Sequence, residues 1–283
     1  MKFKSITRKA ILIGCPGDGI TSRFLGGVAK DLRNMKKFVM STKGGSFKED
    51  EVVTFMDPTV NILLANIQAV RADYVLVYFS GHGFTRFDKK RMVALRDGNI
   101  ADVNLLNSSP RQLVIVDACR TQQQIPGLSG LSIESETGID HYDGASTYDY
   151  FSELIALSPE GKLIVHATQH GKASIDNSSY GGLFTQSLLH VSNRMNADQV
   201  HAPCTVQQVL AHVPGVIKLN GGNQVPAIVY STGNFKVPFA LSMTKPEKGV
   251  IRQTSNEFKI SDEAIVVTLL ALVVACVVVA SSN

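Results

Sequence analysis

The 283-residue chain has no tryptophan, no long basic run and a formal net charge of only +4. Nucleic-acid-binding proteins usually carry a stronger and more clustered positive charge, so we expect no nucleic-acid partner. The cysteines are few and far apart, with no Cys-x-x-Cys spacing: Cys15, Cys119, Cys204 and Cys276. This pattern argues against a disulfide scaffold or a cysteine-rich zinc site, and it favours a reducing compartment.

Basic residues are also missing from one long segment. Neither lysine nor arginine occurs between Arg120 and Lys162, although acidic residues are frequent there. Residues 121–157 are rich in glycine, serine and glutamine, which predicts a long loop followed by a short helix. A loop of this length inside a compact domain is usually functional or disordered.

The remaining composition, with 44% hydrophobic and 18% charged residues, is typical of a folded protein. Near-continuous apolar runs predict strands covered on both faces, at 11–15, 52–56, 74–79, 113–117, 163–167 and 227–230. Helical spacing predicts helices between them, at 25–39, at 60–70 after a start at Asp57-Pro58, at 183–195 and at 206–212. This alternation predicts a mostly parallel sheet in a three-layer α/β fold.

The stretch 264–280 is an uncharged apolar run, AIVVTLLALVVACVVVA. Its length is at the short edge of what spans a bilayer, and its β-branched residues would also suit a buried strand. We favour a membrane anchor, because a polar stretch precedes the run and four cations flank it: Lys245, Lys248, Arg252 and Lys259. The expected organisation is a folded domain at 1–242, a polar linker at 243–263 and a single-pass tail anchor at 264–280. The cations predict that the domain stays cytoplasmic.

The motif YFSGHGF at 78–84 ends an apolar strand with a histidine between two glycines. In open α/β sheets the carboxyl ends of the strands are where ligands bind, and glycine lets a ligand approach the backbone closely. His82 is therefore a candidate catalytic residue. The alternative is an ordinary histidine in a tight turn, so His82 needs a partner.

Cys119 follows a second apolar strand, in the motif VIVDACR at 114–120. If the two strands are parallel neighbours, Cys119 and His82 share one crevice. A nearby imidazole can take the thiol proton and later protonate the leaving amine, while the backbone N–H groups of Gly83 and Cys119 donate to the developing oxyanion. A cysteine alone would more often be a buried core residue, but the paired motifs favour catalysis.

These motifs resemble those of the caspase-like cysteine peptidases (peptidase C14), in particular the metacaspase and bacterial caspase-homologue branch. Residues 24–39 are similar to the first metacaspase helix, and HATQHGKASIDNSSYGGLFTQSLL at 166–189 is similar to a later metacaspase segment. The resemblance covers most of residues 8–240. It implies a six-stranded sheet flanked by helices, a His82–Cys119 dyad and a thiol endopeptidase acting on proteins or peptides.

The chain also departs from the caspase pattern. Caspases carry Gln-Ala-Cys-Arg-Gly, whereas this chain has Asp117 and Thr121 at the outer positions. The resemblance to metacaspases implies a P1 pocket formed by Asp31, Ser80 and Asp117. Two carboxylates in one pocket repel each other unless a cation enters, so we expect cleavage after Arg, with Lys second. The alternative for Asp31 is an ordinary solvent-facing helix carboxylate.

A preference for basic P1 residues would prevent the enzyme from cutting itself within 121–161. Many metacaspases need calcium, and Asp97 and Asp102 lie in the corresponding region. Two carboxylates supply fewer than the six to eight oxygens that calcium prefers. We therefore expect no required cofactor, and whether calcium regulates the enzyme is left open. The resemblance implies a role in cell death, stress or defence.

Two alternatives belong to other functional classes. One is a catalytically silent caspase-fold scaffold at a membrane. The other is a nucleotide-binding domain, although the GCPGDG turn at 14–19 lacks the Lys-Ser/Thr ending of a phosphate-binding loop.

Overall fold

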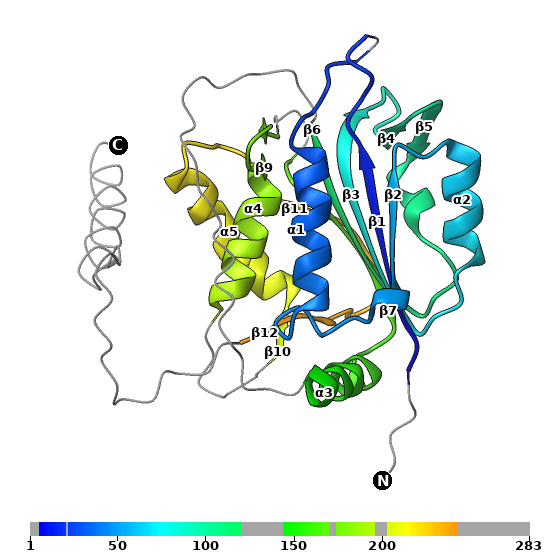
Figure 1. Cartoon of the computed structure of the whole chain (residues 1–283), viewed down its shortest axis with the longest axis vertical. Coiled ribbons are helices and arrows are strands. Elements are labelled where there is room, and N and C mark those ends of the chain that lie inside the picture. Colours follow the sequence, from blue (N-terminus) through cyan, green and yellow to red (C-terminus); the bar gives the residue numbers. More distant parts are fainter. Residues whose placement is uncertain (1–5, 21, 120–143, 170–173, 196–202, 243–283) are drawn as a thin grey trace, which may run out of the picture. The chain divides into compact units, whose positions relative to one another are not determined.

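The computed structural model describes residues 6–20, 22–119, 144–169, 174–195 and 203–242 (Figure 1). The predicted linker at 243–263, the predicted anchor at 264–280 and most of the acidic loop lie outside these residues. Within the described part of the chain, no helix is long and apolar enough to cross a membrane. The proposed domain boundaries and the anchor therefore stay predictions.

A central sheet forms the middle layer of the fold. Its strand order is β11-β7-β6-β3-β1-β2, and every pair is parallel except β11 with β7. The strands are β1 (Arg8–Cys15), β2 (Val52–Met56), β3 (Tyr74–Thr85), β6 (Arg111–Cys119), β7 (Gly161–His166) and β11 (Ala227–Ser231). The predicted mostly parallel, six-stranded sheet is confirmed.

The strand β3 is longer than predicted, because it continues through the histidine motif to Thr85. Beyond the motif it turns back as an antiparallel hairpin with β4 (Arg91–Leu95), which in turn pairs with β5 (Gly98–Ala101). Two small ladders, which the sequence patterns also did not predict, join β10 (Pro203–Thr205) to β12 (Pro238–Leu241) and β8 (Asp176–Asn177) to β9 (Gly181–Gly182).

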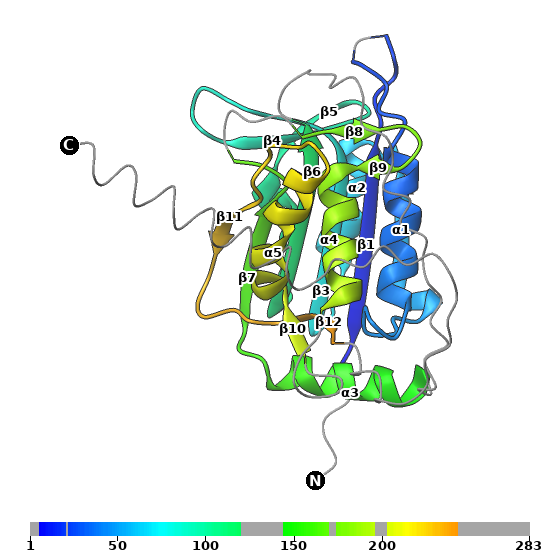
Figure 2. The same cartoon turned by 90° about the vertical axis from the view of Figure 1, so that its left-hand side faces the viewer.

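Helices cover both faces of the sheet, as predicted. Figure 2 shows α1, α4 and α5 over one face, with α3 across the end at which β1 begins. The helix α2 covers the other face (Figure 1). Their bounds are α1 (Val28–Met40), α2 (Val60–Ala69), α3 (Gly144–Leu157), α4 (Leu183–Arg194) and α5 (Val206–Leu219), with 3-10 turns η1 (Glu49–Glu51) and η2 (Asp102–Leu105).

The start of α2 differs from the prediction. The N-cap is Thr59, whose side chain accepts a hydrogen bond from the Ile62 backbone N–H at 3.4 Å. Asp57 instead adopts a left-handed backbone with φ of 51°, and its N–H donates to the Gly14 carbonyl. The Asp57 backbone therefore closes the turn after β2, and the helix begins two residues later.

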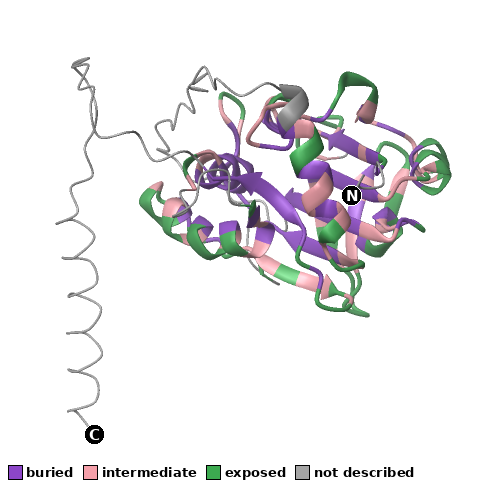
Figure 3. Ribbon diagram, turned by 90° about the horizontal axis from the view of Figure 1, so that it is seen from below, coloured by how far each residue is buried: buried purple, intermediate pink, exposed green. Residues whose placement is uncertain are grey.

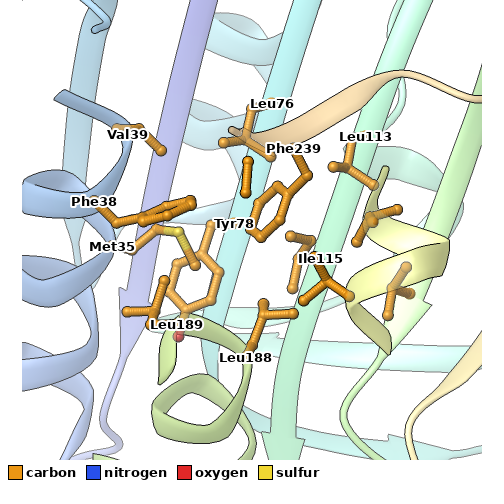
Figure 4. Close-up of a cluster of buried hydrophobic side chains, with 14 of the residues drawn as sticks. Met35, Phe38, Val39, Leu76, Tyr78, Leu113, Ile115, Leu188, Leu189 and Phe239 are labelled. Atoms are coloured by element: carbon orange, nitrogen blue, oxygen red, sulfur yellow. The ribbon is translucent and has the colours of Figure 1, made fainter. Parts of the chain in front are cut away.

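The sheet separates two apolar clusters. Leu76 and Tyr78 face the side of α1 and α4, where Figure 4 shows them with Met35 and Leu188, whereas Val77 packs on the side of α2. Figure 3 shows the inner strands of the sheet as buried, and exposed residues lie on outer helix faces, loops and the edge strands β2 and β11. Burying each such side chain contributes about 1.5–3 kcal/mol. Because side chains alternate along a strand, the even positions of β3 face α1 and α4.

Candidate active site

His82 and Cys119 lie side by side at the carboxyl end of the sheet. The ladder between β3 and β6 is parallel, with Ser80 opposite Asp117 and His82 opposite Cys119. Neighbouring strands are about 4.8 Å apart, and residues paired in register belong to the same face of a sheet. The predicted adjacency of the two motifs is thus present in the backbone.

The His82 ring has a backbone partner. Its Nε2 atom lies 2.6 Å from the carbonyl oxygen of Arg23, in the loop between β1 and α1. A carbonyl can only accept, so Nε2 carries the hydrogen, and in the neutral ring Nδ1 keeps its lone pair. No sequence pattern indicates this partner, because a backbone carbonyl leaves no residue signature.

Three glycines let the backbone close tightly around His82. Gly17 has a φ of +82°, and a β-carbon there would lie 3.0 Å from the His82 Nε2 atom. A β-carbon at Gly81 would lie 2.5 Å from the Cys15 carbonyl, and one at Gly83 would lie 2.7 Å from the Ala118 side chain. Close packing therefore requires glycine on both sides of the histidine.

The predicted pocket residues come together from three elements. Asp31 of α1 accepts a hydrogen bond from the Ser80 hydroxyl at 2.9 Å, and Ser80 is paired in register with Asp117. Asp31 is only 1% exposed and Asp117 only 5%. Asp31 is therefore not a solvent-facing carboxylate.

Backbone and hydroxyl donors hold both carboxylates in place. The other oxygen of Asp31 accepts from the Gly182 N–H at 2.8 Å. Asp117 accepts from the Ser174 hydroxyl at 2.9 Å, and from the Thr185 N–H and hydroxyl at 3.2 and 2.7 Å. A carboxylate offers about four acceptor sites, so some acceptor capacity is left on each group.

Burial makes this pair of acids unusual. Desolvation raises the pKa of Asp31 well above its ordinary value, and the charge of Asp117 raises it further. Desolvation also raises the pKa of Asp117, against the hydrogen bonds from Thr185 and Ser174. Two ionised carboxylates are therefore unfavourable here without a cation, which suits a pocket for a basic group.

A third acid, Asp176, was not among the predicted site residues. Its carboxylate lies 3.4 Å from the Gly27 N–H. Burial raises the pKa of Asp176, while Arg23 and His82 oppose that rise. Asp176 also raises the pKa of both Asp31 and Asp117, so it belongs to the same electrostatic cluster. Its only sequence signal was its position within 166–189.

The strand β9 covers both pocket carboxylates. Gly181 has a φ of +100°, and a β-carbon there would clash with Asp31. A β-carbon at Gly182 would clash with Asp117. The backbone of β9 therefore packs directly against the two acids, and glycine is required at both positions.

The two candidate calcium residues have protein partners instead. Asp97 accepts a hydrogen bond from the Val60 N–H at 2.8 Å, where α2 begins. Asp102 lies 2.7 Å from Arg91 Nε and 2.8 Å from His166 Nε2. In the described ranges, no group of three or more His, Cys, Asp or Glu residues is arranged to hold a metal ion.

Comparisons with known proteins bear on the family and the fold. Residues 7–237 match the family model of the caspase domain, Peptidase_C14. The fold is similar to the crystal structure of caspase-1 from Spodoptera frugiperda, at 17% identity and a TM-score of 0.56, over 85% of this chain and 92% of that one. At this identity the likeness shows the fold alone. No curated protein matches the chain. The family match covers most of the sequence, and the chain therefore belongs to the caspase domain family of peptidases, C14.

Proposed function

We propose that the protein is a cysteine endopeptidase that uses a Cys119–His82 dyad. The observation that carries this proposal is the register between β3 and β6, which pairs His82 with Cys119 at the carboxyl edge of the sheet. The contact between His82 and the Arg23 carbonyl supports it, because this contact orients the imidazole. Caspase-family membership implies protein substrates.

The mechanism follows from these groups. His82 takes the proton of the Cys119 thiol, and the thiolate attacks the scissile carbonyl. The N–H groups of Gly83 and Cys119 stabilise the oxyanion, and His82 protonates the leaving amine. Water, deprotonated by His82, then hydrolyses the thioester and restores the thiol.

Specificity for a basic P1 residue is the second part of the proposal. Asp31 and Asp117 are buried and have raised pKa values, so an entering guanidinium would allow both to ionise. The guanidinium would donate charge-assisted hydrogen bonds to the acceptor sites of Asp31 and Asp117 that no donor in the described part of the chain uses. Ser80 would be a neutral neighbour of this cation. Arginine can bind in a bidentate manner and lysine cannot, so Arg ranks first.

The dyad chemistry requires no cofactor, and calcium would act only as a regulator. We also propose that 264–280 anchors the chain in a membrane with the peptidase domain in the cytoplasm, in a cell-death, stress or defence pathway. Alkaline carbonate extraction of membranes from cells that express the chain tests the anchor. Release of the full chain into the supernatant would contradict it.

Peptide cleavage tests the proposed function directly. The purified full chain is assayed with quenched peptides that differ only in P1, as Arg, Lys or Asp, with and without calcium. We expect cleavage of Arg over Lys, none after Asp, and no turnover by Cys119→Ala. Equal turnover by Cys119→Ala would refute the dyad, and no turnover by the wild-type chain would favour the silent scaffold.

A further inference from the structure

The tip of the β3–β4 hairpin combines exposed aromatic and basic side chains. Phe87 is fully exposed and Phe84 is 39% exposed. The cations Arg86 and Lys90 both lie near Asp88, at 3.7 and 3.4 Å, and their side chains are 54% and 65% exposed. Exposed ion pairs of this kind contribute little, so these cations can exchange partners at low cost.

The hairpin continues the strand that carries the candidate site. Ser80, His82 and Phe84 are alternate residues of β3, so they follow one another on one face at intervals of about 7 Å. Ser80 contacts the acidic pocket through Asp31. A peptide with its P1 side chain in that pocket and its scissile bond at His82 would therefore extend its next residues towards the hairpin.

The charge changes sign along this line. Asp31 and Asp117 lie on the pocket side of His82, and Asp176 is paired in register with Gly182, whose N–H donates to Asp31. On the other side Arg86, Lys89 and Lys90 are opposed only by Asp88 within the tip. Complementary charges select partners and orient them, so one polarity of substrate fits this surface best.

We propose that residues 84–90 form a subsite for the part of the substrate that follows the scissile bond. The subsite takes acidic residues, whose carboxylates pair with Arg86, Lys89 and Lys90, while Phe84 and Phe87 cover apolar neighbours. The preferred substrate is thus a basic residue followed by an acidic segment. This inference rests on the proposed peptidase function.

The test compares two quenched peptides that are identical up to the P1 Arg and continue with either Glu-Asp or Lys-Lys. We expect the wild-type chain to prefer the acidic peptide by about tenfold in kcat/KM, and the preference to shrink in high salt. The triple variant Arg86→Glu, Lys89→Glu, Lys90→Glu should reverse the preference. The neutral triple variant with Gln at these positions should abolish it.

A matched control carries the same charge change away from the hairpin. Arg71, Arg194 and Lys236 are exposed. Arg71 precedes the first residue of β3, Arg194 ends α4, and Lys236 follows Phe235, which lies against Gly161 at the start of β7. The triple Glu variant at these positions should keep the wild-type preference. If this control lost the preference for the acidic peptide to the same extent, the net charge of the protein alone would determine the preference, and the proposed subsite would be overturned.

Two further readouts separate the subsite from the peptidase itself. An arginyl aminocoumarin has no peptide residue after the scissile bond, so its cleavage tests the proposed function alone. Because the chain has no tryptophan, Phe87→Trp provides a single indole that reports peptide binding even without cleavage. A blue shift with the acidic peptide and none with the basic one supports the subsite. No shift with the acidic peptide, or a hairpin variant that changes aminocoumarin cleavage as much as peptide cleavage, would overturn it.

Discussion

The Nε2 atom of His82 lies 2.6 Å from the carbonyl oxygen of Arg23. This contact sets the tautomer and orientation of the imidazole, so the loop between β1 and α1 is part of the candidate site. The loop can approach so closely because Gly17 has no side chain. A β-carbon there would lie 3.0 Å from Nε2 and 2.9 Å from the Arg23 carbonyl.

The first prediction is that Gly17→Ala lowers kcat by about tenfold or more, with little change in KM, because the Arg23 carbonyl and the ring are displaced. Steady-state kinetics with an arginyl peptide measure the effect. Gly19→Ala is the matched control, since Gly19 has a similar φ of +75° but its nearest neighbour, Phe24, is 3.7 Å away. The left-handed backbone should cost each variant about 1 kcal/mol of stability. Gly17→Ala should lose somewhat more, because its β-carbon would also clash with the Ser22 hydroxyl oxygen. Equal kcat values in the two variants would contradict the role of the contact.

The second prediction concerns the buried acid pair. Asp31→Asn should reduce kcat/KM for arginyl peptides by about a hundredfold, because one carboxylate of the cation site is lost. The variant should still fold, since the amide oxygen can accept from the Gly182 N–H and the amide nitrogen can donate to the Ser80 hydroxyl. An unchanged kcat/KM for arginyl peptides would show that Asp31 does not bind the P1 side chain.

The stability of the same variant tests the raised pKa values. A carboxyl whose pKa is higher in the folded state binds more protons there than in the unfolded chain. Stability therefore falls as the pH rises from about 4 through the raised pKa of Asp31. Asp31→Asn removes this contribution, so its melting temperature should fall less than that of the wild-type chain between pH 4 and pH 8. A steeper fall in the variant would show that the pKa of Asp31 is lowered.

The resemblance to metacaspases named the proposed pocket residues, and strand positions explain why two of them lie next to each other. Asp117 and Ser80 are each two residues before a motif residue on neighbouring parallel strands, so the register brings them together. Asp31 was assigned to the pocket only by the resemblance to metacaspases, and the structure places it, buried, in the first turn of α1. Asp176 and the Arg23 carbonyl lie in connecting segments, where no periodic pattern fixes a position in space.

The fold shows the same difference between residues in long apolar strands and residues in segments without a periodic pattern. The long apolar runs predicted every strand of the main sheet, and β2 has the predicted bounds. The continuation of β3 beyond Phe79 was missed, because Gly81 and Gly83 have low strand propensity, and partner strands hold this stretch in the ladder. The short β4 and β5 were missed because charged residues surround them and no long apolar run marks them.

The third prediction concerns the ion cluster on the other side of the sheet. Burial opposes ionisation of Asp102, but hydrogen bonds from His166 and Arg91 outweigh it and hold its pKa below the ordinary value. Asp102→Asn should therefore cost about 3 kcal/mol in urea denaturation at pH 7, because it leaves His166 and Arg91 without their charged partner. This stabilisation exists above the unfolded pKa and is lost as the pH falls through the lowered folded pKa.

The difference between Asp102→Asn and the wild-type chain should consequently shrink below about pH 4. Asp88→Asn serves as the control, because Asp88 forms exposed ion pairs and one exposed hydrogen bond from the Lys90 N–H, which the amide oxygen of Asn can also accept. Its unfolding curve should match that of the wild type. A difference for Asp102→Asn that is equally large at pH 7 and at pH 3 would show that the carboxylate charge is not the cause.

The fourth prediction is a difference in thiol reactivity. Burial raises the pKa of Cys15 to about 12, with Asp57 as a second cause, so this thiol stays protonated and inert at neutral pH. Burial also raises the pKa of Cys204. Iodoacetamide at pH 7 should therefore modify Cys119 before Cys15 and Cys204, and peptide mass spectrometry identifies the modified residue. Faster modification of Cys15 than of Cys119 would contradict the activation of Cys119 by His82.

The most direct measurement is covalent labelling of the full chain by an arginyl chloromethylketone, read by intact-protein and peptide mass spectrometry. A thiolate aligned by His82, beside a pocket for a basic side chain, predicts one label per chain on Cys119. The label should be lost in Cys119→Ala, strongly slowed in His82→Ala, and absent with the aspartyl reagent. Labelling of Cys119 at the same rate in His82→Ala, or by both reagents alike, would contradict the account.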